Sequence, residues 1–226
     1  MAMAGEPTKG TETGKITLWG YHSSSCTWRV RLALGLKDIP FEYKPVNFAA
    51  GQNKSEEYRK ISPLGYVPAV EVDGAAFADS MAIIMYLEEK FPDKKPLLPV
   101  DPLARAVVRQ VVYLITANIQ PLQNVGVLNE IEALLGADAR LKWAQDHINA
   151  GFTALEQILK KVSGKYTFGD ELTIADVVLL PQVENANKRY KVDLTPYPII
   201  ARIGKALLEL PEVQASLPAN QPDYPQ

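Results

Sequence analysis

Residues 21–31 read Tyr21-His22-Ser23-Ser24-Ser25-Cys26-Thr27-Trp28-Arg29-Val30-Arg31 and lie between a predicted strand and a predicted amphipathic helix. The strand is expected over residues 16–21, and the helix follows from apolar side chains that recur at helical spacing up to Leu36. A helix begins with unpaired N–H groups and a partial positive charge, which favour an anion such as a thiolate. Serine is also a preferred N-cap residue, so the turn by itself is equally consistent with a structural cap.

The composition is that of a globular chain with one large or two small domains. Of its 226 residues, 47% are hydrophobic and 22% are charged, and the formal net charge is −2. Without an overall basic field, nucleic acid and membrane are not expected partners, and no apolar run approaches the roughly 20 residues that span a bilayer. The single cysteine excludes an internal disulfide and suits a reducing compartment, so a cytoplasmic protein is expected. His22 and His147 lack metal-ligand spacing, so no metal is expected.

The first part of the chain, residues 15–91, alternates short strand and helix patterns. The expected strands lie at residues 16–21, 41–46, 67–72 and 75–77, and helical segments lie within residues 30–36, 51–60 and 80–91. Asp73-Gly74 separates the last two strands and is a strong hairpin signal. This order predicts an α/β domain with a thioredoxin-like fold, in which helices cover a mixed four-stranded sheet. Residues 1–14 are polar and are expected to be a disordered tail.

The second part of the chain is predicted to be an all-helical domain over residues 102–226, after a proline-containing linker over residues 92–101. Helices are expected at residues 102–118, 138–161, 173–188 and 198–208, with a short one from Pro211. Thr173-Ile174-Ala175-Asp176 is a variant of the capping box, and we interpret it as structural. The proline-rich residues 221–226 are expected to fray.

Several segments carry motifs that are specific rather than generic to such a fold. Residues 24–31, Ser-Ser-Cys-Thr-Trp-Arg-Val-Arg, strongly resemble the signature Ser-Ser-Cys-x-x-Arg-Val-Arg of zeta-class glutathione transferases, the maleylacetoacetate isomerase family. The likeness continues in residues 62–69, 79–84, 119–124, 151–156, 169–171, 192–198 and 221–223. It therefore covers about residues 16–223. The resemblance implies a thioredoxin-like glutathione-binding domain, a helical second domain, glutathione as cofactor and a homodimer.

The resemblance also implies the site residues. Ser24 matches the serine that donates to the sulfur of glutathione, with Ser25 and Cys26 assisting at the helix start, although Cys26 is as consistent with simple packing. The other expected glutathione contacts are Gln52 and Asn53 at the glycine end, Val67 and Pro68 at a cis-proline corner, Asp79 and Ser80 at the γ-glutamyl end, and Gln120 and Asn124 on one helical face towards the cleft. Ser80 is expected to cap its helix as well, and Arg189 matches an arginine assigned to the acidic acceptor substrate.

The implied function is glutathione-dependent cis–trans isomerisation of maleylacetoacetate to fumarylacetoacetate, in tyrosine and phenylalanine breakdown. Transferase activity and dehalogenation of α-haloacids are expected as side activities. Two alternatives stay open: a glutaredoxin-like thiol transferase that uses Cys26 as nucleophile, and a non-catalytic glutathione transferase-like binding module. Against the first, Arg29 occupies the position of a resolving cysteine. Against the second, the chain keeps the Ser24-Ser25 pair.

Overall fold

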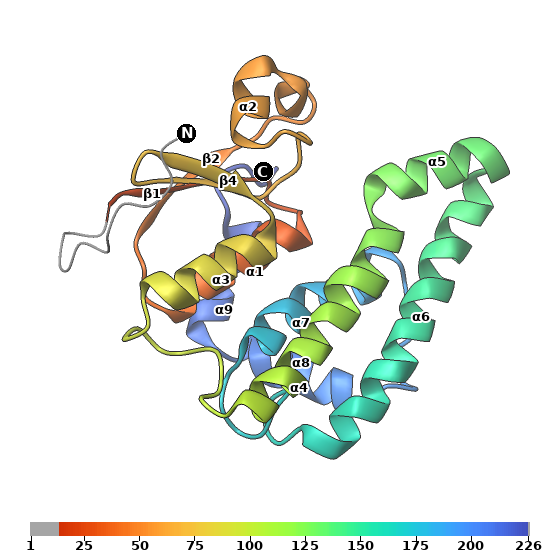
Figure 1. Ribbon diagram of the computed structural model, residues 1–226. Coiled ribbons are helices and arrows are strands. Elements are labelled where there is room, and N and C mark those ends of the chain that lie inside the picture. Colours follow the sequence, from red (N-terminus) through yellow and green to blue (C-terminus); the bar gives the residue numbers. More distant parts are fainter. Residues whose placement is uncertain (1–13, 226) are drawn as a thin grey trace.

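The computed structural model describes residues 14–225 and contains one four-stranded sheet (Figure 1). The strands are β1 (Ile16–Gly20), β2 (Phe41–Pro45), β3 (Ala69–Val72) and β4 (Ala75–Ala78), in the order β2-β1-β3-β4. β1 runs parallel to β2 and antiparallel to β3, and the β3–β4 hairpin turns at Asp73 and Gly74, which both have positive φ. This mixed sheet confirms the predicted thioredoxin-like fold. The expected tail over residues 1–14 lies outside the described residues, apart from Gly14.

Side-chain alternation along the strands divides the core between the two faces of the sheet. Leu18 and Val70 belong to the main core, which they share with α1 (Ser25–Leu36) and α3 (Ser80–Lys90). Trp19 and Ala69 belong to a smaller cluster that is completed by Tyr58 of α2 (Glu56–Ile61), and a short 3₁₀ turn, η1 (Gln52–Lys54), precedes α2. The helices thus cover both faces of the sheet.

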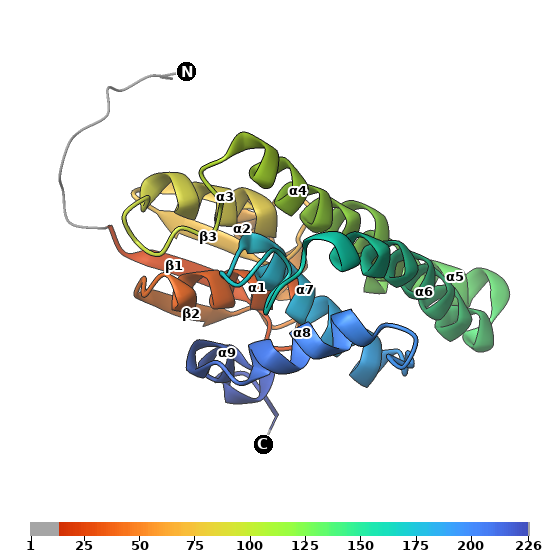
Figure 2. The same ribbon diagram turned by 90° about the horizontal axis from the view of Figure 1, so that it is seen from below.

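α1 is buried along almost its whole length. Ten of its twelve residues are buried, because the helix contacts α3 as well as α7 (Ile174–Glu184) and α9 (Pro211–Ser216) (Figure 2). The expectation of an amphipathic helix at this position is therefore wrong. Its buried residues include the polar side chains of Thr27, Arg29 and Arg31, which must find their partners inside the protein.

The second part of the chain is helical, as predicted. Its helices are α4 (Pro102–Tyr113), α5 (Val125–Leu135), α6 (Ala137–Val162), α7, α8 (Pro198–Leu208) and α9. α7 lies at the centre, since its residues from Ile174 to Val183 are all buried and it contacts α1, α4 and α8. Within residues 14–225, none of the helices combines the length and the apolar character needed to cross a bilayer.

Two expected helices change to π-helical geometry in their last turns, and one helix was missed. The α-helical geometry of α4 ends at Tyr113, and the chain continues as a π-helical segment, η2 (Leu114–Ile119). In the same way α7 passes into a second π-helical segment, η4 (Asn185–Arg189). The missed helix is α5, because its apolar residues do not follow the spacing of a helix with one buried face. Leu134 and Leu135 are 78% and 66% exposed, and Leu128 is its buried residue.

The capping box at residues 173–176 starts α7, as predicted. The Thr173 N–H donates to Asp176 Oδ2 at 2.8 Å, and the Ala175 N–H donates to Thr173 Oγ1 at 3.2 Å. Asp176 also accepts the N–H of Thr167 through Oδ1 at 2.8 Å and is only 1% exposed. One carboxylate therefore holds both the start of the central helix and the loop before it.

Replacing Asp176 with alanine is expected to lower the free energy of unfolding by about 2–4 kcal/mol, because the buried N–H groups of Thr167 and Thr173 lose their acceptor. Urea denaturation of both proteins measures this difference. Asp93→Ala is the control, since Asp93 is exposed, and its loss should stay within about 0.5 kcal/mol. Equal losses in the two variants would contradict a special role for the capping box.

Candidate active site

The turn at residues 21–24 places Ser24 as the N-cap of α1. The Ser24 N–H donates to the Tyr21 C=O at 3.0 Å, and Ser24 Oγ accepts the Thr27 N–H at 3.1 Å. The Ser24 side chain is half-buried, and its hydroxyl hydrogen has no acceptor among the described residues. Because the oxygen already accepts a bond from the helix, the hydroxyl is set to donate outwards. Capping and donation to a ligand are therefore compatible at this residue.

The first turn of α1 adds positive potential to the same place. The N–H groups of Ser25 and Cys26 make no hydrogen bond among residues 14–225, and the turn contains no acidic residue. Ser25 is buried and Cys26 is half-buried. The structure thus brings Ser24, Ser25 and Cys26 together at one helix end that favours an anion.

Arg29 supplies a second source of positive charge, which the sequence analysis missed as a site residue. It is 2% exposed, and its Nη1 donates to Ser80 Oγ at 3.3 Å. Its Nε and Nη2 have no hydrogen-bond partner in the described part of the chain. A buried guanidinium with two unpaired nitrogens is costly unless an anion lies nearby. Arg29 therefore favours an anionic ligand at the start of α3, where Ser80 lies.

At the start of α3 the structure corrects one expectation. Asp79, with φ +87°, is the N-cap residue, and its Oδ1 accepts the N–H groups of Met81 and Ala82 at 2.8 and 2.9 Å. The expectation that Ser80 caps this helix is wrong, because Ser80 is already the first helical residue and its hydroxyl accepts from Arg29 instead. Asp79 is exposed, whereas Ser80 is buried beside the arginine.

The Val67-Pro68 bond is cis, as the resemblance implied. β3 begins two residues later, and neither the N–H nor the C=O of Val67 makes a hydrogen bond within the described residues. The loop before it is held on its other side, where the Tyr66 C=O accepts from Tyr58 Oη and Ser62 Oγ, both at 2.8 Å. Val67 therefore offers a free backbone N–H and C=O that a peptide-like ligand can pair with.

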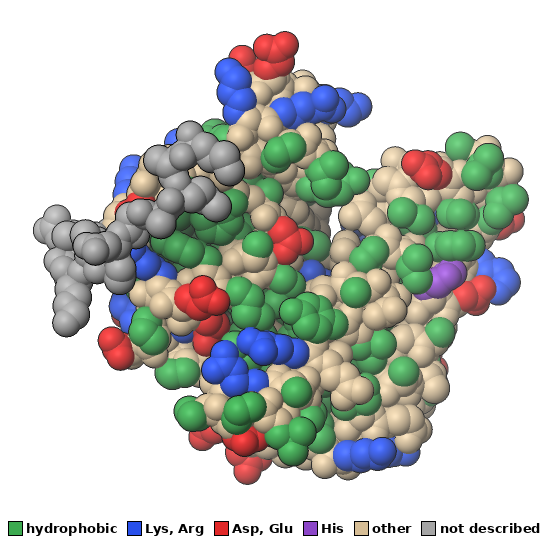
Figure 3. All heavy atoms as spheres, viewed as in Figure 1, with side chains coloured by type: hydrophobic (Ala, Val, Ile, Leu, Met, Phe, Trp, Pro, Cys, Tyr) green, Lys and Arg blue, Asp and Glu red, His purple; other side chains and the backbone are tan. Residues whose placement is uncertain are grey.

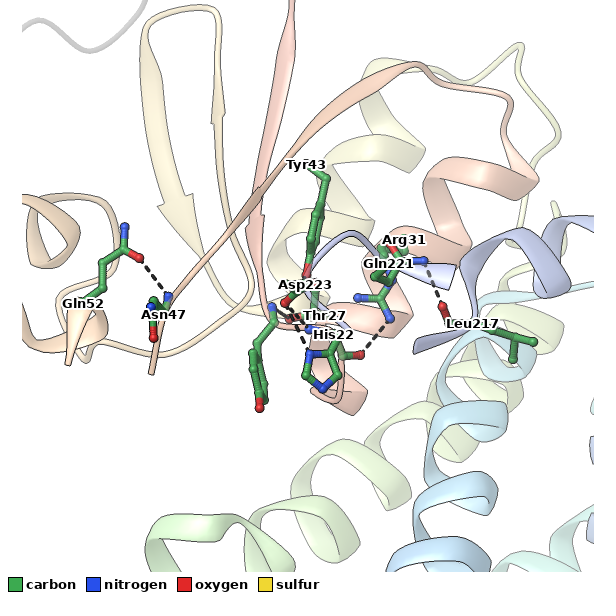
Figure 4. Close-up of polar contacts among 10 residues, drawn as sticks. His22, Thr27, Arg31, Tyr43, Asn47, Gln52, Leu217, Gln221 and Asp223 are labelled. Atoms are coloured by element: carbon green, nitrogen blue, oxygen red, sulfur yellow. Dashed lines mark hydrogen bonds and ion pairs between the residues drawn. The ribbon is translucent and has the colours of Figure 1, made fainter. Parts of the chain in front are cut away.

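Gln52 and Asn53 lie together in η1. Gln52 Oε1 accepts the Asn47 N–H at 2.8 Å, which fixes the side chain and leaves its Nε2 free to donate (Figure 4). Asn53 Nδ2 donates to the Gly65 C=O at 3.3 Å. Asn53 thus connects η1 to the loop before β3, and Gln52 has a free amide donor.

Gln120 and Asn124 do not share a helical face, so that expectation is wrong. Gln120 begins a 3₁₀ turn, η3 (Gln120–Gln123), which contains Pro121, and Asn124 has extended backbone as the N-cap of α5. Asn124 Oδ1 accepts the Gly126 N–H at 3.1 Å. The chain therefore turns between the two residues instead of continuing as one helix.

Arg189 is exposed at the end of η4, and its guanidinium lies 5.6 Å from the centre of the Tyr190 ring. Tyr190 Oη donates to the Gln123 C=O at 2.9 Å. The Arg189 segment is thus attached to the turn that contains Gln120, although the two are about 70 positions apart. In the space-filling view the surface is hollowed between the sheet side and the α5–α6 pair (Figure 3).

The segment after α9 is ordered as far as it is described, so the expectation that residues 221–226 fray is wrong for residues 221–225. Gln221 Nε2 donates to the Leu217 C=O at 2.9 Å, and Asp223 Oδ2 accepts the His22 N–H at 2.8 Å (Figure 4). Asp223 thus reaches the 21–24 turn. In the sequence, the one signal that pointed to Asp223 was its place in a motif that resembles the zeta class.

Two family models match the chain: "Glutathione S-transferase, N-terminal domain" over residues 18–95 and "Glutathione S-transferase, C-terminal domain" over residues 132–218. Maleylacetoacetate isomerase of Rattus norvegicus is 49% identical over 216 residues, which cover 95% of this chain and 97% of the relative. A zeta-class glutathione S-transferase of Euphorbia esula is 44% identical over 224 residues, 99% of this chain and 97% of the relative. The chain belongs to the zeta class of glutathione transferases.

A solved structure agrees with this assignment. Maleylacetoacetate isomerase from Anaeromyxobacter dehalogenans 2CP-1, with glutathione bound in its active site, superposes with a TM-score of 0.86 at 36% identity and covers 95% of this chain and 100% of its own. This zeta-class protein is an enzyme, and its cofactor is glutathione. The residues present fit that cofactor: a free Ser24 hydroxyl, an unpaired Arg29 and a free Val67 backbone suit its thiolate, carboxylate and peptide groups.

Proposed function

We propose that this zeta-class enzyme isomerises maleylacetoacetate to fumarylacetoacetate with the help of glutathione. The observation that carries the proposal is that the Ser24 hydroxyl at the N-terminus of α1 accepts the Thr27 N–H and has no acceptor of its own among the described residues. The similarity to maleylacetoacetate isomerases along almost the whole chain supports this choice of substrate. Tyrosine and phenylalanine breakdown follows from the substrate, and the single cysteine supports a cytoplasmic location.

The chemistry needs an ionised thiol close to a held acceptor. Glutathione supplies the thiolate that adds to the activated double bond and leaves again after rotation about the resulting single bond. Ser24 donates its hydroxyl hydrogen to the sulfur and so lowers the thiol pKa. The free N–H groups of Ser25 and Cys26 add to the same stabilisation.

The other residues hold glutathione in place. The Val67 backbone pairs with the cysteinyl unit beside Pro68, and Ser80 with Arg29 behind it receives the γ-glutamyl carboxylate. The proposed partners of its remaining groups are Asp79 for the amine, Gln52 and Asn53 for the glycine end, and Gln120 and Asn124 on the side of the helical part. Arg189 receives a carboxylate of the acceptor.

The same thiolate can displace halide from α-haloacids and can attack other electrophiles, so we also propose dehalogenase and transferase side activities. A thiol transferase of the glutaredoxin type is disfavoured, because position 29 holds a buried arginine and the chain has no second cysteine. A non-catalytic binding module would have no need of the free Ser24 hydroxyl.

Replacing Ser24 with alanine is expected to lower kcat for isomerisation of maleylacetone by a factor on the order of 10² to 10⁴, because the thiolate loses its positioned donor. Steady-state kinetics with and without glutathione measure the effect. Ser23→Ala is the matched control, since Ser23 is exposed and makes no side-chain hydrogen bond among the described residues. A kcat within a few-fold of the parent for Ser24→Ala would transfer the role to Ser25 or Cys26.

Replacing Arg189 with alanine is expected to raise KM for maleylacetone several-fold, because a carboxylate of the acceptor loses a bidentate partner. Glutathione binding, measured by calorimetry, should stay nearly unchanged, and a neutral acceptor should show a smaller effect. Lys191→Ala is the matched control, because it removes another cation from the same segment. The Lys191 Nζ donates to the Lys188 C=O. Equal weakening of acceptor and glutathione binding would make Arg189 a structural residue.

We also propose a homodimer in which the sheet part of one subunit packs on the helical part of the other. Exposed apolar residues occur on both parts: Leu64 and Tyr66 before β3 are 75% and 58% exposed, and Leu103 and Tyr113 on α4 are 74% and 51% exposed. Sedimentation should therefore give twice 24.9 kDa, and Tyr66→Asp should dissociate the dimer. Leu134→Asp on α5 should leave the mass unchanged. A mass of 24.9 kDa for the parent at micromolar concentration would refute the proposal.

A further inference from the structure

The 21–24 turn is held at one residue, His22, by two parts of the chain that are remote from each other. The His22 N–H donates to Asp223 Oδ2 at 2.8 Å, and the His22 C=O accepts from Arg31 Nη2 at 3.1 Å (Figure 4). The turn is closed by the Ser24 N–H, which donates to the Tyr21 C=O. Fixing His22 therefore fixes the backbone from which the Ser24 hydroxyl projects.

The carboxyl group of Asp223 has several polar neighbours. Arg31 is buried beside it, and burial lowers the pKa of Arg31 while Tyr43 and Asp223 act in the opposite direction. Tyr43 Oη donates to Asp223 Oδ2 at 3.4 Å, and burial together with the carboxylate raises the pKa of Tyr43, which keeps the donor proton in place. His22 Nδ1 lies 3.5 Å from the same oxygen. A carboxylate held in this way is a strong acceptor for a backbone N–H.

The segment that delivers Asp223 is itself anchored on α1. Ser216, at the end of α9, accepts from Trp28 Nε1 through its hydroxyl at 2.8 Å and from Arg31 Nε through its C=O at 3.2 Å. After Asp223, the Tyr224 ring meets the His22 ring edge-on with 5.4 Å between centroids. The segment is therefore bound to the first part of the chain before and after the carboxylate.

We propose that Asp223 is a positioning residue for Ser24: its bond to the His22 N–H holds the 21–24 turn so that the Ser24 hydroxyl meets the sulfur of glutathione. The inference rests on the proposed role of Ser24. A hydrogen bond from a hydroxyl to a thiolate depends on distance and direction, and a shift of about 1 Å can reduce a rate by about 10²-fold. Asp223 does not contact Val67 or Ser80, the proposed glutathione-binding residues on other elements. Its loss therefore affects the thiol more than the binding of glutathione.

The test compares full-length Asp223→Ala, Asp223→Asn and Asp223→Glu with the parent. The pKa of the glutathione thiol in the binary complex is measured by titrating the ultraviolet absorbance of the thiolate, beside kcat and KM for maleylacetone and the Kd of glutathione. Asp223→Ala should raise the bound thiol pKa towards that of free glutathione and lower kcat by about 10-fold to 10²-fold, with little change in Kd. Asp223→Asn keeps an acceptor oxygen and should recover most of the loss. Glu209→Ala, at an exposed carboxylate after α8, should match the parent.

A parent-like thiol pKa in a folded Asp223→Ala enzyme would overturn the proposal, even if its melting temperature falls, since the segment would then be only structural. If Asp223→Ala fails to fold, Asp223→Glu decides, because it keeps the charge beside Arg31 and moves the carboxylate by one methylene. It should raise the thiol pKa, and a parent-like value would overturn the proposal. Failure of the parent to isomerise maleylacetone would refute the proposed function separately, because the thiol titration needs no acceptor.

Discussion

The burial of α1 between the sheet and the helices of the second part determines where the site lies. With ten of its twelve residues buried, this helix has free polar groups mainly at its first turn, where Ser24 and Cys26 are half-buried. α3 packs beside α1, and β3 pairs with β1. The site combines the start of α1, the start of α3 and the free backbone of Val67 before β3. These elements are held together by α1, so the position of the site depends on how α1 packs.

The two arginines of α1 illustrate how charge inside a protein can serve different ends. Arg31 donates through Nε and Nη2 to the C=O groups of Ser216 and His22 and lies near the Asp223 carboxylate, while its Nη1 has no partner among the described residues. Arg29, two residues earlier, has only Ser80 as a partner. Since buried guanidinium groups are expensive to leave unpaired, the first is a structural tie and the second has capacity left for a ligand.

Features set by neighbouring residues were predictable from the sequence, and features set by distant contacts were not. The hairpin at Asp73-Gly74 and the cap at Asp176 depend on a few adjacent positions, and both were predicted correctly. Pro121 turned a presumed helix into a 3₁₀ turn, so the Gln120 face was misplaced. Asp223 appeared to belong to a fraying end because its partner lies 201 positions away. The resemblance to the zeta class located the thiol site at Ser24. The partners of the charged side chains around it were determined by tertiary packing.

The contact between Asp223 and His22 has a consequence for the order in which the protein matures. Synthesis proceeds from the N-terminus, so residues 21–24 are made long before residue 223, which must close a loop of 201 positions. Such remote contacts form late in folding. Until residue 223 has been made, the serine turn therefore lacks one of its two restraints at His22. The geometry of the turn that carries Ser24 is thus completed by a residue that is made 201 positions after His22.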